Sequence, residues 1–167
     1  MKKIYYLILI AMVQVLMLSA CTNSGMVGMP NPWIECGDNL ECAAKKAGFK
    51  FPLVLSNYQV RAMDDMIEIT YPLDEVRNVV VRKCSHETDN LDISGVYTDY
   101  PIKDKIELKN EIMVNVRRDT SKIYVAYFAA ESGVFSIYCE QGISAKELQG
   151  IFDIISEAET SQLPNFD

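Results

Sequence analysis

The first residues that could do chemistry are in the segment Cys84-Ser85-His86-Glu87, which holds the only histidine of the chain. A thiol and an imidazole this close together could bind a metal ion or form a Cys–His nucleophile pair. No further cysteine or histidine stands nearby in the sequence to complete a tetrahedral site, and a single histidine in a polar stretch is usually solvated. We therefore expect neither a metal site nor a catalytic pair at His86.

Oxygen-bearing side chains crowd the same segment, because Glu87, Asp89, Asn90 and Asp92 follow closely. Such side chains could bind calcium, but their spacing does not match an EF-hand loop, so we interpret them as an acidic, solvated loop. The sequence also contains no Walker glycine loop, no dinucleotide fingerprint and no nucleophile elbow. We expect no catalytic residue, no metal and no cofactor, and therefore no enzyme.

The densest basic pairs are Arg82-Lys83 and Arg117-Arg118, in a chain whose net charge is −7. They could bind an anion, but basic residues on strands more often guard sheet edges against pairing, and we favour that interpretation. Residues 21–167 hold 14 basic and 23 acidic residues, a net charge of −9. Phosphate backbones repel a domain of this charge, so we expect no nucleic acid partner.

The N-terminal segment has the composition of an export signal. Lys2 and Lys3 precede a run of apolar residues from position 4 to 18, and the run closes on Leu18-Ser19-Ala20-Cys21. A basic start, an apolar centre and a small-residue exit are typical of a secretory signal peptide. The closing residues resemble the lipobox of bacterial lipoproteins, which implies cleavage before Cys21 and diacylation of its thiol. A retained membrane anchor is the alternative, but the run is short of the ~20 residues that span a bilayer.

These features predict the domain organisation. Residues 1–20 are expected to be the signal peptide, and residues 21–32 the lipidated Cys21 with a flexible tether rich in Gly, Pro, Ser and Asn. Residues 33–160 should form one α+β domain, and residues 161–167 a polar tail. Since two or more acyl chains hold a protein stably on a membrane, we expect an extracytoplasmic protein anchored to the outer face of the cell membrane.

Four cysteines remain when Cys21 carries lipid, and disulfides persist outside the cytoplasm. Cys36, Cys42, Cys84 and Cys139 allow three pairings. We favour Cys36–Cys42, across the start of the first helix, together with Cys84–Cys139, which would join two strand ends. Cys84 shares a strand face with Arg82, which argues against the second bridge. The alternative is that one or both pairs remain buried thiols.

The pattern of apolar residues predicts a helix at each end of the domain. Asp38 should cap a first helix that ends at Gly48, with Glu41 completing a capping box. Ser144 and Glu147 form a second capping box before the apolar stripe Leu148, Ile151, Phe152, Ile155 and Ala158.

Alternating segments between the helices predict strands at 58–63, 66–71, 78–84, 105–108, 112–118, 122–130 and 134–139. Tight turns are expected at Asp64-Asp65 and Glu131-Ser132-Gly133. The predicted fold is an α+β antiparallel sheet of about six to seven strands, packed by an N-terminal helix and a C-terminal amphipathic helix.

Several short segments, in order, carry a resemblance over most of residues 29–157. They are Asn31-Pro32-Trp33, Leu40-Glu41-Cys42-Ala43, Ala47-Gly48-Phe49, Arg82-Lys83 and Asp92-Ile93-Ser94-Gly95-Val96-Tyr97. The chain resembles a family of uncharacterised secreted domains and lipoproteins, found largely in Gram-positive gut bacteria. The family is a domain of unknown function, so the resemblance implies no catalytic residues, and the four mature cysteines are not part of the shared pattern. It implies a lipid in the outer leaflet of the cytoplasmic membrane.

The functional expectation is a non-enzymatic binding module that binds an envelope protein or a small ligand. Candidate residues for an aromatic binding patch are Tyr97, Tyr100, Tyr124, Phe128 and Tyr138. An extracellular sensor or regulatory domain acting with a membrane partner is the alternative. An enzyme of unrecognised type would need clustered carboxylates in a cleft.

Overall fold

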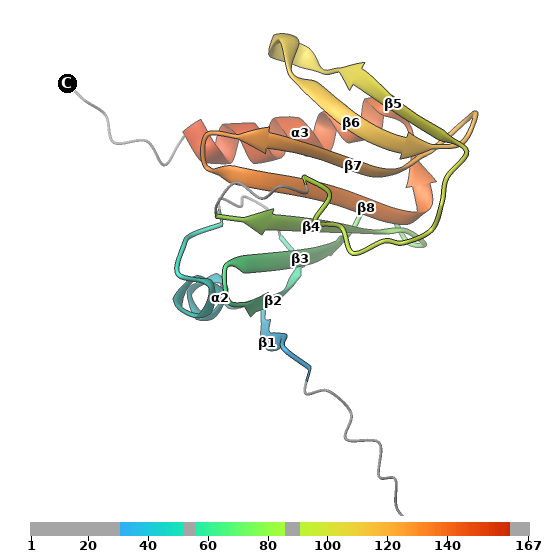
Figure 1. Cartoon of the computed structure of the whole chain (residues 1–167). Coiled ribbons are helices and arrows are strands. Elements are labelled where there is room, and N and C mark those ends of the chain that lie inside the picture. Colours follow the sequence, from blue (N-terminus) through green and yellow to red (C-terminus); the bar gives the residue numbers. More distant parts are fainter. Residues whose placement is uncertain (1–30, 52–55, 86–90, 161–167) are drawn as a thin grey trace, which may run out of the picture. The chain divides into compact units, whose positions relative to one another are not determined.

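The computed structural model describes residues 31–51, 56–85 and 91–160 (Figure 1). The expected signal peptide, Cys21, most of the expected tether and the expected polar tail lie outside these residues. His86, with Glu87, Asp89 and Asn90, lies outside them as well. Neither of the α-helices in the described ranges is long and apolar enough to cross a membrane.

The described chain forms an eight-stranded sheet with two α-helices. In chain order the elements are β1 (Ile34–Gly37), α2 (Leu40–Ala47), β2 (Gln59–Met63), β3 (Met66–Pro72), β4 (Asn78–Cys84), β5 (Ile102–Glu107), the short 3-10 helix η1 (Lys109–Glu111), β6 (Met113–Arg118), β7 (Ile123–Ala130), β8 (Gly133–Ile143) and α3 (Ala145–Thr160). The strand order is β1-β2-β3-β4-β8-β7-β6-β5, and every neighbouring pair is antiparallel.

The sheet consists of two meanders, β1 to β4 and β5 to β8, which meet where β4 pairs with β8 (Figure 1). The predicted class is confirmed, but the described sheet has eight strands where six to seven were expected. The missed strand is β1, at one edge of the sheet. It is four residues long with no buried residue, so it lacks the alternation that reveals a half-buried strand.

One face of the sheet carries the core. Inward residues alternate along each strand, as Val79 and Val81 do on β4 and Phe135 and Ile137 on β8. Both helices contribute to the same buried cluster, α2 through two alanines and α3 through Leu148, Ile151, Phe152 and Ile155. Phe152 of α3 packs edge-on against Phe128 of β7, with ring centres 5.3 Å apart. The opposite side, called the open face below, carries the polar residues of the strands.

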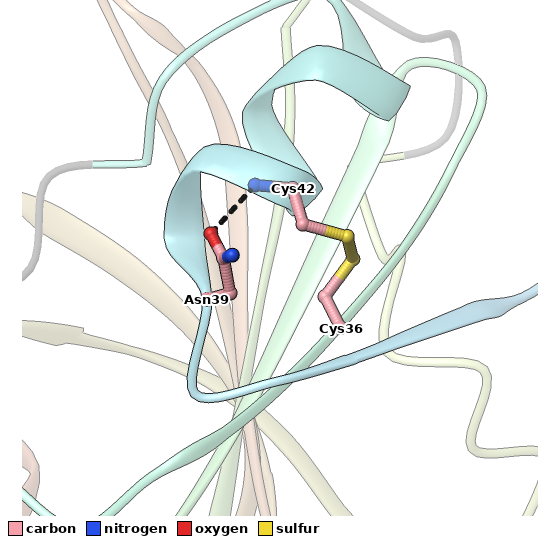
Figure 2. Close-up of a disulfide and its surroundings, with 3 residues drawn as sticks. All are labelled: Cys36, Asn39 and Cys42. Carbon is pink, nitrogen blue, oxygen red and sulfur yellow. Dashed lines mark hydrogen bonds between the residues drawn. A yellow bond between two sulfur atoms is a disulfide. The ribbon is translucent and has the colours of Figure 1, made fainter.

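The helix caps confirm one sequence prediction and correct another. Ser144 N donates to Glu147 Oε2 (2.8 Å), and Glu147 N donates to Ser144 Oγ (3.2 Å), so the capping box of α3 is present. The cap of α2 is Asn39, not Asp38, because Asn39 Oδ1 accepts the N–H of Cys42 at 2.9 Å (Figure 2). Asp38 instead accepts a hydrogen bond from Tyr58 at its backbone carbonyl (3.0 Å).

The Cys36–Cys42 disulfide is present and joins β1 to the first turn of α2, with a Cα–Cα distance of 5.8 Å (Figure 2). The expected Cys84–Cys139 bridge is wrong. Cys84 pairs with Val134, so Cys139 lies five residues farther along β8, roughly 16 Å away at ~3.3 Å per residue. A disulfide needs Cα atoms about 4.4–6.8 Å apart. The two cysteines also face opposite sides of the sheet, and both are buried thiols.

Arg77, in the turn between β3 and β4, ties this turn to α3. Its Nη2 lies 2.6 Å from Glu147 Oε1, and its Nε lies 2.7 Å from Asp74 Oδ2. Hydrogen bonds lower the pKa of Glu147 from 4.5 to about 2. The bond from Arg77 has the largest effect, and the bond from the Ser144 N–H has the second largest. Glu147 therefore binds its proton more weakly in the folded chain than in the unfolded one.

The sign of this shift predicts a pH dependence. The stabilisation from Glu147 is fully present above pH 4.5 and is lost as the pH falls toward 2. In Arg77→Met the pKa of Glu147 should rise toward its ordinary value, so acidification should lower the free energy of unfolding by less than in the wild type. Urea unfolding at a series of pH values measures this difference. Lys50→Met, which removes an exposed charge, should follow the wild type, and equal acid sensitivity of both variants would contradict the assignment.

Reduction should test the contribution of the disulfide. Cys36 and Cys42 are six positions apart, so the closed loop is small and the loss of the bridge should cost about 2 kcal/mol, at the low end of the usual range. Urea unfolding with and without reductant measures this cost. The Cys36→Ala/Cys42→Ala variant should be insensitive to reductant, and a wild type equally insensitive would contradict the expectation.

Candidate functional site

A continuous row of residues crosses the open face, one from each strand. Directly paired residues of neighbouring strands point to the same face of a sheet. The register aligns, from β1 to β5 in spatial order, Glu35, Arg61, Glu68, Arg82, Ser136, Tyr127, Asn115 and Lys105. This cross-strand row begins with charged residues on the first meander and continues with polar residues on the second.

On the first meander the charges of the row neutralise one another. Glu68 is only 4% exposed, and each of its carboxylate oxygens has its own guanidinium. Arg61 Nε lies 2.6 Å from Oε1, and Arg82 Nε lies 2.6 Å from Oε2. The ring of Trp33 covers both arginines, with guanidinium carbons 4.7 and 5.4 Å from the ring centre. In this cluster, the Glu68 clamp, the carboxylate is buried and binds a guanidinium through each oxygen, and we interpret it as structural.

Residues 91–101, the strap, are the described part of the connection that leads from β4 into β5, and β5 is at the far edge of the sheet (Figure 1). Arg82 Nη1 donates to the Ile93 carbonyl at 3.0 Å, which joins the strap to the Glu68 clamp. Gly95 has a φ of +69° and lies so close to Arg82 that a Cβ there would overlap the guanidinium. One end of the strap is thus held against β4.

Arg117 of β6 holds the rest of the strap. Its Nη2 lies 2.8 Å from Asp92 Oδ2, and its Nη1 donates to the Thr98 carbonyl at 3.4 Å. Its guanidinium carbon lies 5.9 Å from the ring centre of Tyr100. Since Arg82 and Arg117 are both on the open face, the strap runs over this face.

The basic pairs are therefore not edge guards, and that prediction is wrong. β4 and β6 are interior strands, so their residues have no sheet edge to protect. Arg82 and Arg117 hold the strap instead. Lys83 points to the opposite side, into the core, where it is 3% exposed and its Nζ lies 5.1 Å from the ring centre of Phe135.

The structure brings together some residues of the predicted aromatic patch. Tyr100 of the strap stacks on Tyr124, with ring centres 4.7 Å apart. Burial is the main cause that raises the pKa of Tyr138, and the nearby Tyr100 raises it further. Phe128 lies in the core, stacked on Phe135, and does not belong to the patch. Tyr97, by contrast, is 96% exposed on the strap.

One hollow lies beside the strap, and a second shares Lys103 with it. The first, of about 390 Å³, is lined by strap residues that include Tyr97 and Asp99, together with Lys103 and Arg117. The second, of about 430 Å³, is lined by Lys103, Asp104, Lys105, Asn115, Val116 and Tyr127. Lys103 lines both, so the two hollows adjoin, and we call them together the open-face hollows. A polar ligand could lie here against residues whose positions are set by strand pairing.

Each carboxylate that lines these hollows already has a cation. Asp92 pairs with Arg117 (2.8 Å), Asp99 with Lys103 (3.0 Å) and Asp104 with Arg118 (3.1 Å). The hydrogen bond from Arg118 also lowers the pKa of Asp104.

Three adjacent members of the cross-strand row have side chains without a polar partner in the described part of the chain. Within residues 31–51, 56–85 and 91–160, no hydrogen bond or ion pair engages the side chains of Lys105, Asn115 and Tyr127. They offer an ammonium donor, an amide and a phenol at neighbouring positions of three strands. Asn115 alternates with the buried Val114 and Val116, and the register between strands brings it beside Lys105 and Tyr127.

The other predicted site residues do not join this surface. Cys21 and His86 lie outside the described residues, and Cys84 is buried with 4% of its surface exposed. Of the proposed acidic loop, the structure describes Asp92, which is paired with Arg117. In the described part of the chain, no group of three or more His, Cys, Asp and Glu residues is arranged to hold a metal ion.

The Glu68 clamp makes a testable contribution to stability. Glu68→Ala would leave two guanidinium groups facing each other without their anion. Breaking a buried pair typically costs 3–5 kcal/mol, and because Arg61 is 34% exposed we expect about 2–3 kcal/mol here. Urea unfolding followed by the fluorescence of Trp33, the only tryptophan, measures the loss. Glu75→Ala, at an exposed position, should change stability by less than about 0.5 kcal/mol, and equal losses would contradict the role of Glu68.

Comparison with known proteins adds no further constraint on this site. No family model, no curated protein and no solved structure matches the chain. The resemblance to secreted and lipid-anchored domains of Gram-positive gut bacteria therefore stays a prediction.

Proposed function

We propose that this protein is a non-enzymatic binding module, anchored to the outer face of the cell membrane by lipid on Cys21, that binds its ligand in the open-face hollows. The anchor is supported by the N-terminal sequence, in which the apolar run ends at Leu18-Ser19-Ala20-Cys21. Membership of the resembled family is part of the proposal, and it agrees with this location.

The observation that carries the binding role is the set of unpartnered polar groups beside the hollows. Lys105, Asn115 and Tyr127 are on three paired strands, so their backbone positions are fixed before a ligand arrives. Binding then orders side chains only, which lowers the entropy that association must overcome. A site on paired strands is more precise than one on loops.

One observation favours the alternative, a sensor that acts with a membrane partner. Arg82 contacts Trp33, which follows the expected tether directly, and it also donates to Ile93 of the strap. A ligand that moved the strap would therefore act on a residue next to the membrane-proximal segment. In this alternative the open-face hollows remain the ligand site, and the output passes through Trp33.

Photo-cross-linking on living cells tests the binding surface. A photoreactive amino acid at Tyr97, which lines the first hollow, should capture the ligand as a mass adduct or a cross-linked partner. The same residue at Val76, which is 78% exposed in the turn between β3 and β4, is the matched control. Capture from position 97 and not from 76 is expected, whereas equal capture from both, or none, contradicts the assignment.

The anchor is tested in the same cells. Wild-type protein should fractionate with membranes, and Cys21→Ala, which cannot be acylated, should be processed abnormally and carry no lipid on its N-terminal peptide. Mass spectrometry of that peptide measures the acylation. An unmodified Cys21 with the apolar segment still attached would support the retained membrane anchor instead.

A further inference from the structure

We propose that the ligand of the open-face hollows is a polysaccharide that carries carboxylate groups. A carboxylate of the chain binds Lys105, and the sugar hydroxyls bind Asn115 and Tyr127. This inference rests on the proposed function and names the chemical class of its ligand.

Charge balance gives the first argument. The three carboxylates lining the hollows, Asp92, Asp99 and Asp104, are each paired with a cation. Lys105 lines the second hollow, and its ammonium group has no carboxylate partner in the part of the chain that the structure describes. A bound ligand should therefore present one negative charge at this position, where a charge-assisted hydrogen bond can form.

The neighbours of Lys105 give the second argument. Asn115 is directly opposite it on β6, and Tyr127 is directly opposite Asn115 on β7. The amide and the phenol can each donate and accept hydrogen bonds, as sugar hydroxyls also do. The aromatic rings of Tyr127 and, in the adjoining hollow, Tyr97 offer apolar faces against which the C–H groups of a sugar ring can pack. One ammonium, one amide and two tyrosines together suit an acidic sugar.

The shape of the site favours a chain over a single sugar acid. The hollows share Lys103 and are open to solvent, so a small ligand in either would bury only part of its surface. Well-formed small-molecule pockets bury most of their ligand. A polysaccharide can contact both hollows at once and gain from each.

The charge of the whole chain limits how anionic the ligand can be. Residues 21–167 carry a net charge of −9, and densely charged polyphosphates would be repelled. Among the described cations that line the hollows, Lys105 is the one without a carboxylate partner, so it can bind one carboxylate of a sparsely charged chain.

Oligogalacturonides provide the probe, because methyl esterification removes their charge and leaves the same sugar chain. The probe is titrated calorimetrically into the full mature chain, which carries Cys21→Ala to keep it in solution. The protein should bind the acid form and should bind the methyl ester more weakly. Lys105→Ala should weaken binding of the acid form about fivefold, the effect of one partly exposed ionic contact. Lys45→Ala removes an exposed lysine of α2 and should leave the affinity unchanged.

The outcomes separate this inference from the proposed function. Equal affinity for acid and ester overturns the carboxylate assignment, and monomeric galacturonate binding as tightly as the oligomer overturns the polymeric one. If neither form binds, while cross-linking from position 97 captures another ligand, the polysaccharide inference fails and the binding surface stands. If neither form binds and position 97 captures nothing, both proposals fail.

Discussion

The pairing of β4 with β8 is the interaction on which the rest of the structure depends. It aligns Val80–Cys84 antiparallel with Val134–Tyr138 and so joins two meanders into one sheet. Because β8 is the last strand of the second meander, this pairing places β5 at the far edge. The chain leaving β4 must then pass β8, β7 and β6 before β5 can form. The strap is therefore a consequence of strand order.

The strap in turn determines the chemistry of the open face. A connection over a sheet face brings backbone carbonyls and charged side chains close to strand residues, and these groups need partners when water is displaced. Arg82 and Arg117 supply them, since one binds the Ile93 carbonyl and the other binds Asp92 and the Thr98 carbonyl. The strap lines the first of the open-face hollows, and residues of β5, β6 and β7 line the second.

Internal pairing of charges distinguishes structural residues of this face from candidate binding residues. Glu68 is enclosed by two arginines, and its bonds to them hold three strands together. Lys105 belongs to the same cross-strand row on the second meander, and its side chain has no ion pair within the described residues. A polar group that the fold already satisfies gains little from a ligand, whereas one that only water satisfies can exchange that water for a ligand, at a net gain of about 0.5–1.5 kcal/mol. This difference is the reason why we propose the second meander as the binding surface.

The amino-acid sequence by itself determined the local structure. Period-two alternation predicted the hairpin of β2 and β3 around Asp64-Asp65, and the capping box with its apolar stripe predicted α3. These signals depend on residues within a few positions of one another. The disulfide of Cys36 and Cys42 was predicted in the same way, because the two residues are only six positions apart. The lipid anchor on Cys21 is likewise a prediction from local sequence.

Only the tertiary structure decided which segments meet. The register of β4 against β8 excludes the Cys84–Cys139 bridge and makes Arg82 and Arg117 interior residues. β1 is a strand because it pairs with β2. None of its residues is buried, so its sequence lacks the alternation of a half-buried strand. Tyr127, Asn115 and Lys105 are on three different strands, and only strand pairing places them side by side. Local patterns cannot encode it, because a side chain's neighbours on a sheet are set by hydrogen-bond register between distant segments.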